Sequence, residues 1–137
     1  MIVDSAVWID SLRGTRNRGV AALGHALRTK QRISMTPVVL QEVLQGARSM
    51  EQFESWAARF GSIPMLSPPD LASTLREAAR LYVRCRSAGV TPRSGNDCHI
   101  ARVAIEFDVP VLTSDRDFAL IARVEPTLRL ALIEDRQ

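Results

Sequence analysis

The sequence lacks the features of several common protein classes. It has only two cysteines, Cys85 and Cys98, which form neither a CxxC pair nor a disulfide framework, so we expect two buried free thiols. No run approaches the roughly 18 apolar residues of a membrane helix. Asp4 interrupts the first apolar run, where a secretory signal would continue. We therefore expect a cytoplasmic protein without membrane contact.

Two further absences argue against a nucleotide hydrolase and against a histidine-based mechanism. The GxxxxGK[ST] loop of nucleotide hydrolases does not occur. Neither His25 nor His99 is placed as an acid or base, so a metal-independent mechanism with paired histidines is poorly supported. Lys30 is the only lysine among 18 Lys and Arg residues, so 17 are arginines. Arginine favours contacts with phosphates and bases, which indicates nucleic acid, although a GC-rich genome explains this bias equally well.

Length and composition predict one domain over residues 1–137. The chain is 46% hydrophobic with a net charge of +3, and no repeat or linker divides it. Strand-like runs alternate with helical patterns, which predicts an α/β fold with a parallel sheet and helices on both faces. The expected strands are 1–4, 32–35, 63–66, 109–113 and 128–133. The expected helices are 6–12, 20–29, 37–45, 50–60, 71–88, a helix capped by Asn96 or Asp97 and ending near Phe107, and 117–124.

Four carboxylates occur at or within one turn of the points where an expected strand passes into a helix. They are Asp4, Glu42, Asp97 and Asp115. In a parallel α/β sheet such positions open onto one crevice, where these folds bind their ligands. Clustered carboxylates repel one another unless a cation neutralises them, and ligand sets made only of oxygen suit Mg²⁺ or Mn²⁺. The pattern predicts a metal-dependent phosphodiester hydrolase.

Each acid also has an ordinary structural explanation. Asp4, Asp97 and Asp115 could each cap a helix or stabilise its dipole, and Glu42 could be a solvated residue inside a helix. Asp117 is a fifth acid that could be a ligand, a residue that orients water, or a helix cap. Four independent caps have no reason to converge, whereas a metal site requires convergence, so the joint arrangement favours the metal site.

Four segments resemble a known family. They are residues 2–10 (IVDSAVWID), 36–43 (TPVVLQEV), 93–101 (RSGNDCHIA) and 112–118 (LTSDRDF). In order and spacing they resemble a PIN-domain ribonuclease of the VapC toxin type, over essentially the whole chain. Each segment is weak alone, but four in order across one short domain are specific. His99 departs from the family pattern, which commonly has an aliphatic residue there, and we interpret it as a structural residue that points away from the acids.

The resemblance implies a fold, an activity and partners. The fold would be the three-layer PIN-like α/β fold. Asp4, Glu42, Asp97 and Asp115 would be the catalytic acids; Asp4, Asp97 and Asp115 would bind metal directly, with Glu42 and Asp117 as further candidates. The activity would be Mg²⁺- or Mn²⁺-dependent endonucleolytic cleavage of RNA with one or two ions. The partner would be a VapB-type antitoxin of a type II toxin–antitoxin system.

Residues around the acids would support such a site. Hydroxyl groups next to the acids, which would orient them or bind water, belong to Ser5, Thr113 and Ser114. The arginines that we expect to bind substrate are Arg93, Arg116 and Arg13. Residues 41–60 carry more large apolar surface than two short helices must bury. The surplus is either internal core, or a groove for an antitoxin segment or a contact in a homodimer, which we also expect.

Two other functions remain open. A non-catalytic PIN-like interaction module would have lost one or more of the four acids, yet all four are present. A PIN nuclease of RNA processing would act without an antitoxin, and an adjacent gene for a short DNA-binding protein would argue against it. The sequence does not identify which RNA is cleaved.

Overall fold

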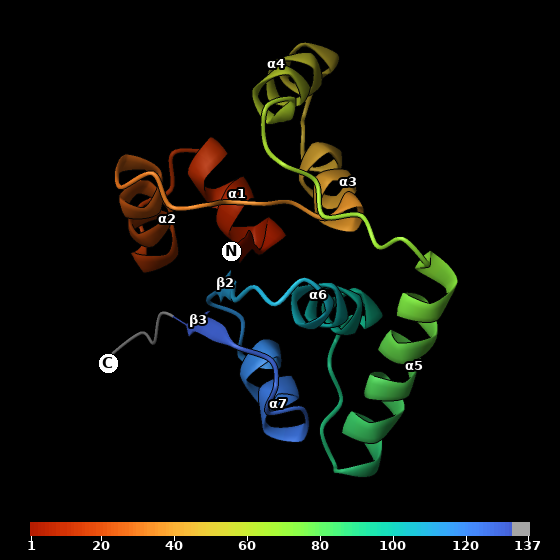
Figure 1. Cartoon of the computed structure of the whole chain (residues 1–137). Helices are drawn as coiled ribbons and strands as arrows, with labels where there is room; N and C mark the ends of the chain where they lie inside the picture. Colours follow the sequence, from red (N-terminus) through yellow and green to blue (C-terminus); the bar gives the residue numbers. More distant parts are fainter. Residues whose placement is uncertain (133–137) are drawn as a thin grey trace.

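A parallel sheet of short strands lies at the centre of the fold, with helices on both faces (Figure 1). The computed structural model describes residues 1–132, so the expected strand residue Ile133 lies outside the described residues. The strands are β1 (Ile2–Val3), β2 (Val111–Thr113) and β3 (Leu130–Leu132). The helices are α1 (Ser5–Leu12), α2 (Arg18–Arg28), α3 (Pro37–Gln45), α4 (Met50–Phe60), α5 (Leu71–Ser87), α6 (Gly95–Glu106) and α7 (Arg116–Val124).

The sheet has the order β1-β2-β3, and all of its pairings are parallel. Two expected strands, 32–35 and 63–66, are reduced to isolated parallel bridges, one from Ser34 to Ile2 and one from Met35 to Met65. Pro64 has no N–H to donate, so it accepts a hydrogen bond from Met35 but cannot continue the ladder. The prediction of full strands there was wrong, although both segments extend the edge of the sheet.

The strands are apolar except at Thr113, the last residue of β2, and helices cover both faces of the sheet. Ile2, Val3 and Val111 are fully buried, and Leu112 is 2% exposed. Figure 1 shows α1 and α2 on one side of the strands and α7 on the other. Continuous apolar runs are typical of parallel strands buried in this way. The predicted α/β fold is therefore confirmed.

Local capping signals set most helix boundaries. Thr36 accepts a hydrogen bond from the Val39 N–H at 3.2 Å, and Pro37 is the first residue of α3, as predicted. The cap of α6 is Ser94, whose hydroxyl accepts from the Asn96 N–H at 3.1 Å. The prediction of Asn96 or Asp97 as this cap was wrong. Asp97 lies instead within the first turn of α6, and its carboxylate is not used for capping.

The large side chains between the helices form the core. Trp8 and Trp56 are 6% and 4% exposed, and the Trp8 ring packs edge-on against Phe60 with centroids 5.1 Å apart. The two cysteines are buried free thiols, as predicted. Within residues 1–132, no helix is both long and apolar enough to cross a membrane.

Candidate active site

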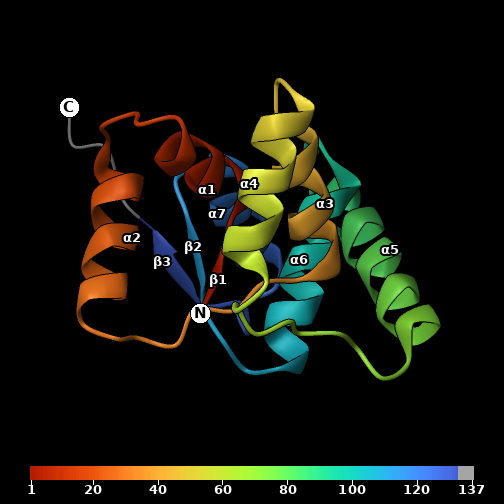
Figure 2. The ribbon, with the colours of Figure 1, turned by 90° about the horizontal axis from the view of Figure 1, so that it is seen from above.

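The candidate site lies at the carboxyl ends of β1 and β2. Asp4 directly follows β1, and Asp115 follows β2 by two residues. Because the two strands are parallel and paired, these ends meet at one edge of the sheet. Figure 2 shows β1 and β2 side by side, with the start of α1 leading away from the end of β1. The chain order therefore brings residues 4 and 115 to the same place.

Asp115 and two further carboxylates form a compact cluster. Asp97, Asp115 and Asp117 each present one carboxylate oxygen, and these oxygens all lie within 4.8 Å of one another. Asp97 comes from the first turn of α6, whereas Asp115 caps α7 and Asp117 lies in its first turn. Two helix N-termini thus direct their dipoles at the cluster, which partly offsets the repulsion between the acids.

Asp4 is tied to this cluster through Thr113. The Asp4 side chain is 5% exposed and occupies the N-cap position of α1, yet it makes no capping hydrogen bond. The fully buried Thr113 hydroxyl donates to Asp4 Oδ2 at 3.1 Å and accepts from the Asp115 N–H at 3.0 Å. Ser5 donates a longer bond of 3.5 Å to Asp4 Oδ1. Capping therefore does not explain Asp4, and Thr113 links it to Asp115.

Glu42 brings the fifth carboxylate from α3. Its Oε1 atom is buried and has no hydrogen-bond partner among the described residues. Burial, and then the charge of Asp4, raise the pKa of Glu42, so these two carboxylates lie in each other's field. A buried carboxylate oxygen without a donor is costly unless a cation or a proton compensates it. This orphaned atom is what a divalent cation would satisfy, so the residues fit such an ion.

The electrostatics of the cluster are clearest at Asp97. Burial raises the pKa of Asp97 to about 7, and the charges of the neighbouring acids add to the effect. The acids responsible are Asp4, Asp115, Asp117 and Glu42. Burial also raises the pKa of Asp4. The other four predicted acids therefore all act on Asp97, although the five come from four separate parts of the chain.

This arrangement matches a known family. A PIN domain profile matches residues 1–124. The chain belongs to the PIN-domain family. It is 31% identical over 125 residues to the VapC ribonuclease Mb1587 of Mycobacterium bovis, a match that covers 90% of this chain and 92% of that protein. The ribonuclease VapC11 of Mycobacterium tuberculosis matches to the same extent. The resemblance to VapC-type PIN domains is thereby confirmed.

Solved structures share the fold of this PIN domain. VapBC2 from Rickettsia felis, bound to a DNA fragment from its promoter, superposes with a TM-score of 0.73 at 16% identity, covering 97% of this chain and 98% of that one. FitAcB from Neisseria gonorrhoeae gives a TM-score of 0.66 at 17% identity, with 94% of each chain covered. At these identities the likeness establishes the three-layer fold.

The arginines predicted to bind substrate lie in three different settings. Arg93 reaches the acid cluster: its Nη2 donates to Asp115 Oδ1 at 2.9 Å and its Nε donates to Asp117 Oδ2 at 3.2 Å. Arg116 is the exposed first residue of α7. Arg13 donates to the Gly46 carbonyl at 3.0 Å, so it joins the end of α1 to the end of α3 rather than the acids. The structure brings only Arg93 into contact with the cluster.

The sequence did not predict the pairing of Arg93 with Asp117. Their spacing of 24 residues follows no helical or strand period, so no local pattern could have revealed the pair. Ser114, predicted to support Asp115, is exposed and makes no hydrogen bond among the described residues. The other two predicted hydroxyls, on Ser5 and Thr113, both contact Asp4.

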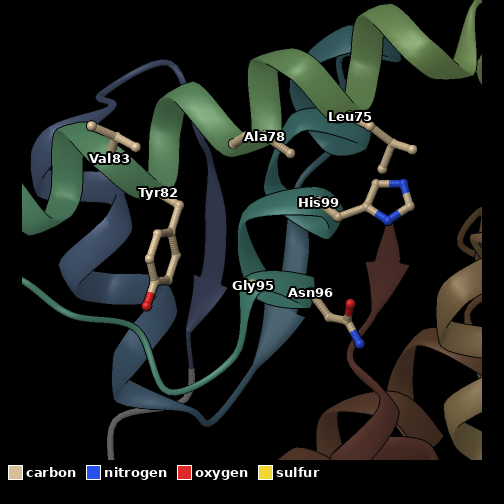
Figure 3. Close-up of a pocket in the computed structure, with 8 residues that line it drawn as sticks. Leu75, Ala78, Tyr82, Val83, Gly95, Asn96 and His99 are labelled. Carbon is tan, nitrogen blue, oxygen red and sulfur yellow. The ribbon is translucent and has the colours of Figure 1, made fainter.

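A hollow of about 400 Å³ adjoins the site between α5 and α6. Figure 3 shows Asn96 and His99 on α6 beside Leu75 and Tyr82 of α5. His99 Nε2 is buried without a partner among the described residues, and burial lowers the pKa of the imidazole. His99 thus lines this hollow, in line with its interpretation as a structural residue.

Replacing Thr113 with valine should weaken the site without unfolding the domain. Valine keeps the shape but removes the hydroxyl that holds Asp4 and the Asp115 N–H. Residues that orient metal ligands are typically worth about 10–100-fold in metal affinity or activity. We expect a loss of that size in Mn²⁺ affinity by isothermal titration. An unchanged Mn²⁺ affinity in a folded Thr113→Val protein would contradict the role of Thr113 as a link.

Proposed function

We propose that this PIN domain, taken over residues 1–137, is the toxin of a type II toxin–antitoxin system and cleaves RNA internally with the help of divalent ions. The observation that carries the proposal is the convergence of five carboxylates at one sheet edge, with the pKa of Asp97 raised to about 7. The relatives named VapC ribonuclease, at 31% identity over 90% of the chain, support RNA as the substrate. RNA cleavage implies a cytoplasmic location.

The residues that would hold Mg²⁺ or Mn²⁺ are Asp4, Asp97 and Asp115, with Glu42 and Asp117 beside them. Carboxylate oxygens alone suit these hard cations, and five acids have enough charge for one or two ions. When bound, such an ion would stabilise negative charge on the phosphate and lower the pKa of the attacking water.

The protein's own residues would carry the remaining chemistry. Glu42, with its raised pKa and unpartnered oxygen, is suited to accept a proton from the water that attacks phosphorus. The phosphorus–oxygen bond to one ribose then breaks, and the departing oxygen takes up a proton from solvent. Asp4 holds its position through Thr113. A non-catalytic module does not explain these acids better, because it has no use for carboxylates that repel one another. A nuclease of RNA processing does not explain them better either, because the relatives are named VapC ribonucleases.

An antitoxin of the VapB type would dock on the apolar surface that joins α1, α2 and α4. A hollow of about 340 Å³ opens there between Trp8, Leu27 and Phe60, with Arg59 and two serines at its rim. Of the apolar residues in 41–60, Trp56 and Phe60 are mostly buried in the core, and Phe60 also lines this hollow. An amphipathic segment with acidic residues beside its apolar face would match the hollow and Arg59. The antitoxin partner is supported further by solved relatives that are toxin–antitoxin complexes.

A homodimer would use the outer face of α5. Leu71, Leu75 and Val83 are 52%, 45% and 48% exposed, which are three of the six large exposed apolar side chains among the described residues. Leu75 and Val83 line the hollow shown in Figure 3. Apolar side chains gathered in this way favour contact with an identical patch about a twofold axis.

Leu75→Glu should convert this dimer into a monomer, because it buries two unpaired charges at the contact. The measurement is molar mass by light scattering after gel filtration. Leu27→Glu, at a 54% exposed position on α2, is the matched control and should keep the dimer. A wild-type monomer, or a Leu75→Glu dimer, would reject this interface.

The proposed activity is tested directly with purified protein and total RNA. We expect internal cleavage with Mg²⁺ or Mn²⁺, no cleavage in EDTA, and a restricted set of cleavage sites when the new RNA ends are sequenced. RNA that stays intact with either ion would reject the nuclease function. An adjacent gene whose product binds the chain and blocks cleavage would support the toxin assignment over a role in RNA processing.

A further inference from the structure

Arg93 is held against the acid cluster by three hydrogen bonds. Its backbone N–H donates to Asp117 Oδ2 at 2.9 Å, and its Nε donates to the same oxygen at 3.2 Å. Its Nη2 donates to Asp115 Oδ1 at 2.9 Å. The backbone around it is anchored as well, since Pro92 is buried and Ser94 caps α6. Arg93 therefore has a defined position at the edge of the site.

The outer half of the Arg93 guanidinium remains available. A guanidinium has five N–H donors in a planar fork. The acids take one from Nε and one from Nη2, so Nη1 and the second Nη2 donor make no hydrogen bond among the described residues. The Arg93 side chain is 77% exposed. The free donors thus face solvent beside the acids, where a phosphate would approach.

This contact engages one carboxylate oxygen of Asp117. Its Oδ2 accepts both bonds from Arg93, and its side chain is only 11% exposed. Asp115 Oδ1 is likewise occupied by Arg93 Nη2 and by the Asp117 N–H at 2.9 Å. The opposite oxygen of Asp115 is left for a cation, together with Asp97 and Asp4. Asp117 Oδ2 and Asp115 Oδ1 therefore hold Arg93, whereas Asp4, Asp97 and the second oxygen of Asp115 face a cation.

We propose that Arg93 is a catalytic residue that binds a non-bridging oxygen of the scissile phosphate, and that Asp117 is the positioning residue that aims it. Arg93 forms and breaks no covalent bond in this role. It donates hydrogen bonds to the oxygen on which negative charge builds up as water attacks, and a donor already in place needs no reorganisation. This proposal rests on the proposed nuclease function. The competing role is that of a stand-in cation, which leaves Asp115 when a divalent ion binds.

Three variants and one control distinguish the two roles. Arg93→Ala removes the fork, Arg93→Lys keeps the charge without it, and Asp117→Asn removes the carboxylate charge that holds it. Arg123→Ala is the control, because Arg123 is an exposed arginine in the last turn of α7, at the opposite end of that helix from Asp115 and Asp117. The three readouts are single-turnover cleavage of a single-stranded RNA with Mg²⁺, Mn²⁺ affinity by isothermal titration, and binding of the same labelled RNA with Ca²⁺ under conditions where gels show it intact.

Arg93→Ala should lower the cleavage rate by about 100–1,000-fold, as the loss of a preorganised donor does. The slope of log affinity against log salt should become less steep by about 0.7–1, the effect of one phosphate contact. Mn²⁺ affinity should be kept or increase. Arg93→Lys should restore the salt slope but little of the rate. Arg123→Ala should change the rate by less than about threefold, within the usual context dependence of a surface residue.

A double-mutant cycle tests Asp117. Asp117→Asn alone should slow cleavage by about 10–100-fold, as the loss of an orienting contact does, and should cost nothing further in the Arg93→Ala background. Additive losses, with weaker Mn²⁺ binding, would make Asp117 a metal ligand and overturn its positioning role. An Arg93→Ala protein that binds Mn²⁺ tightly and cleaves as fast as Arg123→Ala would make Arg93 a stand-in cation. Wild-type protein that neither binds nor cleaves RNA would refute the nuclease function itself, and this proposal with it.

Discussion

Asparagine in place of Asp4 should reduce RNA cleavage by at least about a thousandfold and abolish the growth arrest caused by expression of the chain. A bound ion supplies several kcal/mol of transition-state stabilisation, and each ~1.4 kcal/mol changes the rate tenfold. Asp4 is 5% exposed and bonded to Thr113, so no other carboxylate can move into its place. Asparagine keeps the Thr113 hydrogen bond but removes the charge that an ion requires.

The measurement is the cleavage rate of a defined RNA with Mg²⁺, together with growth after induction. Asp10→Asn is a matched control on the same helix, because the Asp10 carboxylate accepts a hydrogen bond of 3.0 Å from Asn17, outside the site. This control should cleave as the wild type does. Growth arrest that persists in the Asp4→Asn strain would mean that toxicity arises from something other than cleavage at these acids.

The helices and the sheet edge could be predicted because their signals are local. Thr36-Pro37 fixes the start of α3, and the apolar runs at 2–3 and 111–113 are the paired strands β1 and β2. Once those strands are parallel neighbours, residues 4 and 115 must meet at their carboxyl ends. The order of strands and helices in the sequence predicts a parallel sheet, and this topology brings the acids together.

The remaining features depend on contacts across the fold. The segments 32–35 and 63–66 have strand-like composition, but Pro64 limits their pairing to single bridges. Ser94 rather than Asn96 or Asp97 caps α6 because the helix begins at Gly95, two residues earlier than a cap at Asn96 would allow and three earlier than a cap at Asp97 would. The Arg93–Asp117 contact joins a loop to a helix 24 residues away. Helical and strand periods and capping rules concern residues close together in sequence, so they could not predict this contact.

Asp97→Asn should make the ion-free protein more stable and, at the same time, abolish cleavage and stabilisation by Mg²⁺. In the folded protein the pKa of Asp97 is raised from 3.8 to about 7. The folded state therefore binds a proton that the unfolded state releases between these values. The contribution of Asp97 to the stability of the folded state is largest below about pH 4 and is lost as pH rises through about 7. The ionised Asp97 therefore destabilises the ion-free protein above pH 7. Asparagine removes this repulsion.

The test compares unfolding temperatures at pH 6 and pH 8, with and without Mg²⁺. Ion-free wild type should unfold at a lower temperature at pH 8, and Asp97→Asn should recover ~3 °C or more, the effect of about 1 kcal/mol in a domain of this size. Mg²⁺ needs the ionised carboxylate, so it should stabilise the wild type more at pH 8 than at pH 6 and leave the stability of Asp97→Asn unchanged.

Asp108→Asn, at a carboxylate that is 92% exposed, is the control and should behave as the wild type does. Because the stability gain and the activity loss have opposite signs, damage to the fold cannot produce both. An Asp97→Asn protein that is less stable without ions, or still stabilised by Mg²⁺, would show that the five acids do not share one cation site.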